Sequence, residues 1–220
     1  KEIYYTIQGE GFHTGRSAVF VRFSGCNLWT GHEKDRDNAI CNFCDTDFIG
    51  TDGPGGGRFR TPNDLVKNIL SKWPSRSIEK RFVVFTGGEP LLQMDEELIN
   101  VLHFNKFEIA IETNGTVNAP KNIDWICVSP KAGSDLIITK GNELKLVFPQ
   151  HGIDPSQYEN LNFDHFSLQP MDNENLNENI QKTIKYCHEH PLWRLSLQTH
   201  KFVGIPVSYT HLTLPTTRLV

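Results

Sequence analysis

Three of the five cysteines lie in one short stretch, at positions 26, 41 and 44. Fourteen residues separate Cys26 from Cys41, and two separate Cys41 from Cys44. Three thiolates on a polar loop can hold three irons of a 4Fe-4S cluster and leave the fourth iron open to a substrate or cofactor. This spacing therefore makes an open-iron cluster one candidate for the centre of the molecule.

A structural zinc loop is the competing interpretation of the same cysteines. Closed zinc sites take four ligands, usually as two close pairs. Only Cys41 and Cys44 are close here, and His13 or His32 would have to supply the fourth ligand. Spacing alone leaves zinc and an iron–sulfur cluster about equally favoured.

Two further interpretations fit less well. A disulfide framework is disfavoured because the cysteine number is odd and nothing indicates secretion. A calcium loop is excluded because Asp45 and Asp47 begin the EF-hand pattern but Ile49 stands where its third oxygen ligand belongs.

Length and composition favour one soluble domain that acts on a small molecule. The chain has 220 residues with 22 basic and 26 acidic side chains and no basic run, which argues against nucleic acid and membranes as partners. No apolar run reaches the roughly 20 residues of a membrane span, so we expect a cytoplasmic protein with reduced cysteines. Residues 207–220 resemble translated vector sequence, so we expect the folded domain to cover residues 1–206.

Short apolar strands alternate with helices along the chain. Residues 17–23 form a β-branched and aromatic run typical of a buried strand. Thr61 and Pro62 are typical of a helix start, and we expect that helix to end before Pro74. A second helix is expected from about residue 93 to 104. The alternation predicts an α/β fold with a mostly parallel sheet, in which some connections are too short for a helix.

Polar clusters follow the ends of five predicted strands. In parallel α/β sheets the loops at the carboxyl ends of the strands meet at one site. We therefore expect a single site, with the cysteine loop over it. The clusters are Cys26, Gly87–Pro90, Glu112–Gly115, Ser129–Lys131 and Gln169–Asp172.

These motifs resemble a known enzyme family. A three-cysteine loop after one strand and GGEP at residues 87–90 after the next are similar to radical S-adenosylmethionine (SAM) enzymes. Most of that superfamily spaces its cysteines by three and two residues, so the fourteen-residue insert is a departure that narrows the match. With QGEG at 8–11, RFSGCNLW at 22–29, CDTDF at 44–48 and QTHK at 198–201, the chain resembles the 7-carboxy-7-deazaguanine synthases from about residue 2 to 206.

The resemblance implies an open radical SAM β/α barrel and a specific reaction. The family contracts 6-carboxy-5,6,7,8-tetrahydropterin to 7-carboxy-7-deazaguanine with loss of ammonia, in the biosynthesis of queuosine and other 7-deazapurines. It implies three cofactors, a 4Fe-4S cluster, SAM and Mg²⁺, and a flavodoxin- or ferredoxin-type reductant. It also implies a homodimer.

The resemblance assigns roles residue by residue. Cys26, Cys41 and Cys44 would bind the cluster, Thr46 would bind Mg²⁺, and Glu112 would contact the pterin or move a proton. Unaided, the QGEG, SPK and QPMD segments are ordinary loops or turns. The expected SAM contacts are Phe43, Asp45, Gly88, Ser129, Pro130, Lys131, Gln169, Pro170, Met171 and Asp172, and the expected substrate contacts are Ile7, Gln8, Gly9, Arg22, Thr86 and His200.

Two alternatives remain open from the sequence. The first is another radical SAM enzyme, such as a glycyl-radical activating enzyme that acts on a protein. The second is a zinc or iron–sulfur binding module without enzymatic activity. Pterin binding would separate the first from the synthase, and visible iron–sulfur absorption would exclude plain zinc.

Overall fold

The computed structural model describes residues 1–74 and 77–205, and the expected non-native tail at 207–220 lies outside them. One eight-stranded sheet runs in chain order from β1 to β8. Only the β1–β2 pair is antiparallel; every later pair is parallel. The strands are β1 (Glu2–Ile7), β2 (Ser17–Phe23), β3 (Phe82–Gly87), β4 (Glu108–Thr113), β5 (Trp125–Val128), β6 (Lys140–Phe148), β7 (Asn162–Pro170) and β8 (Trp193–Leu195).

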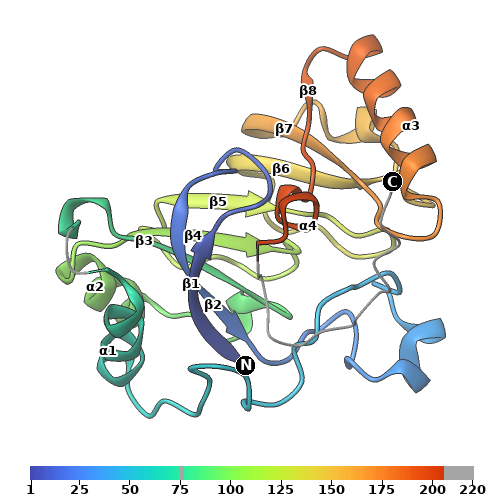
Figure 1. The fold of residues 1–220 in the computed structure, drawn as a ribbon. Coiled ribbons are helices and arrows are strands. Elements are labelled where there is room, and N and C mark those ends of the chain that lie inside the picture. The colour runs from blue at the N-terminus through green and yellow to red at the C-terminus, as the bar shows by residue number, and fades with distance from the viewer. Residues whose placement is uncertain (75–76, 206–220) are drawn as a thin grey trace.

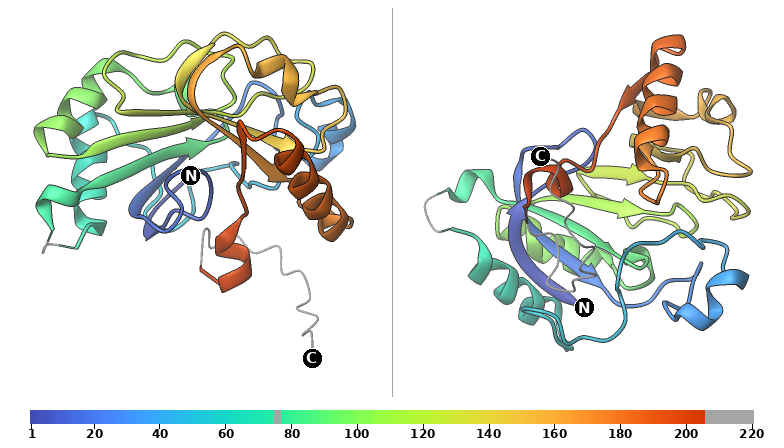
Figure 2. Two further views of the ribbon diagram at one scale, coloured as in Figure 1. Left: turned by 90° about the horizontal axis from the view of Figure 1, so that it is seen from above. Right: turned by 45° about the vertical axis from the view of Figure 1, so that its right-hand side comes forward.

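The sheet curves but does not close, since β1 and β8 form its two ends (Figure 1). Three α-helices contact one face of it: α1 packs on β1 and β2, α2 on β4, and α3 on β7 and β8 (Figure 2). This open α/β barrel confirms the predicted fold class. The α-helices are α1 (Pro62–Lys72), α2 (Glu96–Phe104), α3 (Leu176–Glu189) and α4 (Thr199–Val203), and the 3-10 helices are η1 (Glu33–Asn38), η2 (Ile78–Lys80), η3 (Pro90–Leu92) and η4 (Pro155–Tyr158).

Local sequence signals explain where α1 and α2 begin. The Thr61 hydroxyl accepts a hydrogen bond from the Asp64 amide at 3.2 Å, with Pro62 in the first turn, as the sequence predicts. The second helix begins at Glu96, three residues later than predicted. Asp95 caps it by accepting the Leu98 amide at 2.8 Å, and η3 occupies the residues before it.

Several connections lack helices, as predicted. Residues 114–124 and 129–139 contain no helix, and only η4 lies between β6 and β7. One prediction was slightly wrong: Gln169 and Pro170 are the last two residues of β7 and do not lie beyond it. No helix in the described ranges combines the length and apolar character that a membrane span requires.

The two faces of the sheet differ in polarity. Val21, Phe85, Ile111, Val128 and Leu144 lie on the helix-covered face and are at most 2% exposed. The opposite, concave face is apolar at Phe20, Val84 and Ala110 and becomes polar farther along the strands, toward their carboxyl ends. The strand register places Arg22 beside Thr86 on this face. Farther along the sheet it forms a row of four neighbours, Glu112, Cys127, Glu143 and His165. Cys127 is buried and lies among carboxylates, whereas Cys187 is half-buried.

Candidate active site at the carboxyl ends of the strands

The three cysteines of the loop after β2 are free thiols with different environments. Cys41 is buried, whereas Cys26 and Cys44 are half-buried. A hydrogen bond between the thiols of Cys41 and Cys44, helped by the nearby Lys131, lowers the pKa of Cys41 to about 7 despite its burial. Burial raises the pKa of Cys26, although its Sγ accepts the Leu28 amide at 3.4 Å. The neighbouring Cys44 thiol and the Lys131 charge therefore favour the thiolate form of Cys41.

The donor set of this loop fits an iron–sulfur cluster. Among the described residues, no three His, Cys, Asp or Glu side chains surround a single metal position. Thiolates that hold a 4Fe-4S cluster each bind a different iron, so these three need not meet at one point. Three soft sulfur ligands with an adjacent lysine suit such a cluster and leave one iron free.

Glu89 joins the cysteine loop to the ends of β3 and β4. Its amide donates to the Gly25 carbonyl at 2.9 Å, next to Cys26. Its fully buried carboxylate accepts hydrogen bonds from the Thr113 hydroxyl and the Asn114 amide, both at 2.8 Å. Glu89 was predicted only as a member of the Gly87–Pro90 cluster, without a role of its own.

Gly88 explains why that turn needs a residue without a side chain. A Cβ at this position would lie 1.8 Å from the Gly25 carbonyl oxygen, so the two loops pack backbone against backbone. The structure therefore gives Gly88 a packing role. The expected SAM contact of Gly88 stays a prediction.

Asparagines extend the same junction toward β4. The Asn114 side-chain amide donates to Asn27 Oδ1 at 3.1 Å, and Asn27 donates to the Thr116 hydroxyl at 2.7 Å. The loops after β2, β3 and β4 thus meet, as the strand-end pattern predicts.

The Ser129–Lys131 segment lies beside the close cysteine pair. Lys131 Nζ donates to the Ser129 carbonyl at 2.6 Å and to its hydroxyl at 2.7 Å. Burial lowers the pKa of Lys131, and the charges of Cys41 and Cys44 oppose that shift. The loop after β5 therefore brings a cation to the cysteines.

Lys201 of α4 connects two of the expected SAM contacts. Its Nζ lies 2.9 Å from Asp45 Oδ2 and 2.5 Å from Asp172 Oδ2, so it joins the cysteine loop to the loop after β7. A pocket of about 240 Å³ beside it is lined by Pro170, Asp172 and Gln198, among others. Gln169 is buried, and within the described chain its Oε1 has no hydrogen-bond partner.

The expected substrate contacts Gln8, Gly9 and His200 also lie together. The Gly9 carbonyl accepts the Thr199 amide at 2.9 Å, and a Cβ on Gly9 would lie 2.1 Å from His200 Nδ1. That buried Nδ1 has no partner among the described residues. The Gln8 side-chain amide donates to Glu112 Oε1 at 3.2 Å.

Lys145, for which the sequence predicted no role, lies between two half-buried carboxylates on the concave face. Its Nζ is 2.9 Å from Glu10 Oε2 and 3.0 Å from Glu112 Oε2. Burial raises the pKa of Glu112, and Lys145 opposes this shift. Burial would also raise the pKa of Glu10, but Lys145 and Gln198 outweigh it and lower this pKa to about 2.

Other expected site residues have partners or positions that do not reveal a ligand role. Arg22 Nε lies 2.8 Å from Glu2 Oε1, an ion pair that the sequence analysis did not expect. The Thr46 hydroxyl lies 3.5 Å from Asp45 Oδ1. Among the remaining expected contacts, Ile7 is exposed and Pro130 is buried. The half-buried ones are Phe43, Thr86 and Met171.

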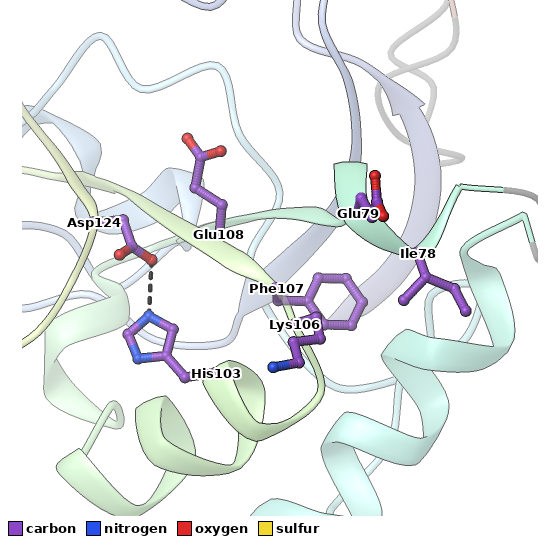
Figure 3. A pocket seen from close by; sticks show the side chains of 7 residues that line it. All are labelled: Ile78, Glu79, His103, Lys106, Phe107, Glu108 and Asp124. Carbon is purple, nitrogen blue, oxygen red and sulfur yellow. Dashed lines mark hydrogen bonds and ion pairs between the residues drawn. The ribbon is translucent and has the colours of Figure 1, made fainter.

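A second pocket lies at the opposite edge of the sheet, at the amino ends of β4 and β5. It has a volume of about 510 Å³ and contains the His103–Asp124 pair, whose Nε2 and Oδ2 are 2.8 Å apart (Figure 3). None of the expected site residues lines it.

Comparison with known proteins gives a consistent result. The profile of the radical SAM superfamily matches residues 38–209, which include Cys41 and Cys44. The 7-carboxy-7-deazaguanine synthase of Bradyrhizobium diazoefficiens is 57% identical over 93% of this chain and 97% of its own length. That of Caulobacter vibrioides is 54% identical over 94% of this chain and 98% of its own.

A solved structure agrees with these relatives. The crystal structure of QueE from Escherichia coli covers 90% of this chain and 92% of its own, with a TM-score of 0.66 and 25% identity. Radical SAM enzymes use a 4Fe-4S cluster and SAM, which suits the three free thiols. The activating-enzyme and binding-module alternatives are therefore set aside, and the chain belongs to the 7-carboxy-7-deazaguanine synthases of the radical SAM superfamily.

Proposed function

We propose that this chain converts 6-carboxy-5,6,7,8-tetrahydropterin to 7-carboxy-7-deazaguanine with loss of ammonia, in the biosynthesis of 7-deazapurines. The observation that carries the proposal is the 57% identity to a synthase over 97% of that enzyme's length. Polar, buried groups on the concave face support it, because a pterin ring needs both donors and acceptors around its edge.

The cysteine loop would hold the cofactors. Cys26, Cys41 and Cys44 would bind the cluster, and the Thr46 hydroxyl would bind Mg²⁺, a hard cation that keeps few protein ligands. Bound cluster and SAM supply the radical chemistry that takes a hydrogen atom from C6 of the pterin and later returns it. We propose that Phe43, Asp45, Gly88, Ser129–Lys131 and Gln169–Asp172 hold SAM.

The concave face would hold and orient the pterin. Glu112 and Gln8 lie within hydrogen-bond distance of each other, so they could accept from and donate to one ring edge. Glu112, whose pKa burial raises, would exchange a proton with a ring nitrogen. Ile7, Gly9, Thr86 and His200 would complete the surroundings, and Arg22 would pair with the carboxylate once released from Glu2.

Electron supply and assembly are further parts of the proposal. The cluster must be reduced, and a flavodoxin- or ferredoxin-type protein would supply the electron. A homodimer is proposed on the family resemblance alone.

The test is an anaerobic assay with reconstituted protein, SAM, Mg²⁺ and 6-carboxytetrahydropterin, read by mass spectrometry. Formation of 7-carboxy-7-deazaguanine, lost in Cys41→Ala, supports the proposal. Cleavage of SAM to 5′-deoxyadenosine without any deazapurine would contradict the substrate assignment while leaving the radical chemistry intact.

A further inference from the structure

The fourteen-residue insert between Cys26 and Cys41 has little core of its own. Its 3-10 helix η1 contains no buried residue and projects beside the sheet (Figure 1). A polar loop of this length has considerable conformational entropy. Some contact must therefore fix Cys26 relative to the Cys41–Cys44 turn.

One side chain in the insert reaches the close cysteine pair. Arg36 Nη1 donates to the Asn42 carbonyl at 2.9 Å and to the Cys44 carbonyl at 3.0 Å. Asn42 lies between the two cysteines in sequence, so the guanidinium group holds the backbone of their turn.

The same guanidinium group also contacts the Cys26 side of the insert. Its carbon lies 4.1 Å from the centre of the Trp29 ring. Trp29 is 7% exposed and packs edge-on against Phe48, with ring centres 5.6 Å apart. Trp29 follows Cys26 by three residues, so this anchored ring gives Arg36 a fixed surface close to the first thiol.

Glu33 fixes the orientation of the guanidinium group. Arg36 Nε and Nη2 each donate to one Glu33 oxygen at 2.6 Å, leaving Nη1 directed at the two carbonyls. Lysine could not make this set of contacts, because it is a single point donor without a planar fork.

We propose that Arg36 is a positioning residue for the iron–sulfur site, which clamps both ends of the long insert and presents the three thiols together. This role concerns the cluster and does not depend on the identity of the substrate. It also explains how three cysteines can bind one cluster when fourteen residues separate the first two, where three residues are usual in the superfamily.

The test compares Arg36→Gln and Arg36→Lys with Lys34→Gln, an exposed neighbour in η1. Each protein is reconstituted anaerobically and desalted, and its iron, its rate of iron loss to a chelator and its reduced electron paramagnetic resonance spectrum are measured. Thermal unfolding of the cluster-free proteins is measured in parallel.

We expect both Arg36 variants to lose iron about 10-fold faster or more, as when a residue supporting metal ligands is removed. The Lys34 variant and all cluster-free melting temperatures should match the wild type. The proposal is overturned if Arg36→Gln keeps wild-type iron loss and spectrum, or if Arg36→Lys does. It is also overturned if the Arg36 variants that lose iron faster also melt at a lower temperature without the cluster. The faster iron loss would then reflect a general loss of stability.

Discussion

Replacing Lys145 by methionine should destabilise the protein by about 3–5 kcal/mol at neutral pH, because it leaves two half-buried carboxylates without their cation. The Lys145 side chain is 6% exposed, and its Nζ lies within 3.0 Å of a carboxylate oxygen of both Glu10 and Glu112. The pKa of Glu10 gives an independent magnitude. Its fall from 4.5 to about 2 corresponds to about 3 kcal/mol of stabilisation.

The sign of the pH dependence follows from the same shift. The folded pKa of Glu10 lies below its unfolded value, so its contribution is complete above about pH 4.5 and is lost as the pH falls toward 2. Without Lys145, burial is no longer outweighed and the folded pKa rises. The stability difference between wild type and variant should therefore shrink as the pH falls through this window.

Urea unfolding at neutral pH and at several acidic values measures the difference. Lys140→Met, at an exposed position on the same strand, is the matched control and should change the free energy of unfolding little. The double variant Glu10→Gln/Lys145→Met should recover part of the loss, because one uncompensated charge is gone. A Lys145→Met loss below about 1 kcal/mol, or a difference that grows toward low pH, would refute the reasoning.

Three further substitutions test the junctions around the site. Gly88→Ala should destabilise the protein by about 1–3 kcal/mol and impair cluster incorporation, measured as iron content, because its Cβ meets the Gly25 carbonyl. Glu89→Gln should lower the free energy of unfolding by about 1–3 kcal/mol, measured by thermal unfolding. The new side-chain NH₂ would face the Thr113 hydroxyl or the Asn114 amide, which are both donors. Lys201→Met should cost at most about 1 kcal/mol in urea unfolding but speed hydrogen exchange in α4, and unchanged exchange would contradict the bridging role.

Much of the fold is predictable from local patterns. Residues 17–23 were predicted as a strand and form β2, because a continuous β-branched and aromatic run suits a strand buried in a parallel sheet. The Thr61 cap gave the start of α1 for a similar reason. The start of α2 was predicted three residues too early, because Asp95 is a strong N-cap and the residues before it form the separate short helix η3.

The polar interior of the site was less accessible to sequence reasoning. Lys145 and Glu10 are 135 residues apart, so no local pattern reveals that they pair. A partial signal existed, since Glu143 and Lys145 alternate with Leu144 and Leu146 and therefore share one face of β6. That alternation marks a strand with one polar face, but only the curved sheet shows that the face is enclosed.

The short segment 198–201 connects the proposed cofactor side of the site to the proposed substrate side. Gln198 donates to Glu10 at 2.9 Å, and His200 lies against Gly9, so this end is fixed to the substrate side. One turn on, Lys201 pairs with Asp45 of the cysteine loop. A movement of α4 must therefore disturb both sides, since a helix of this length moves as a unit. Substitutions in this segment should therefore alter SAM binding and pterin binding together.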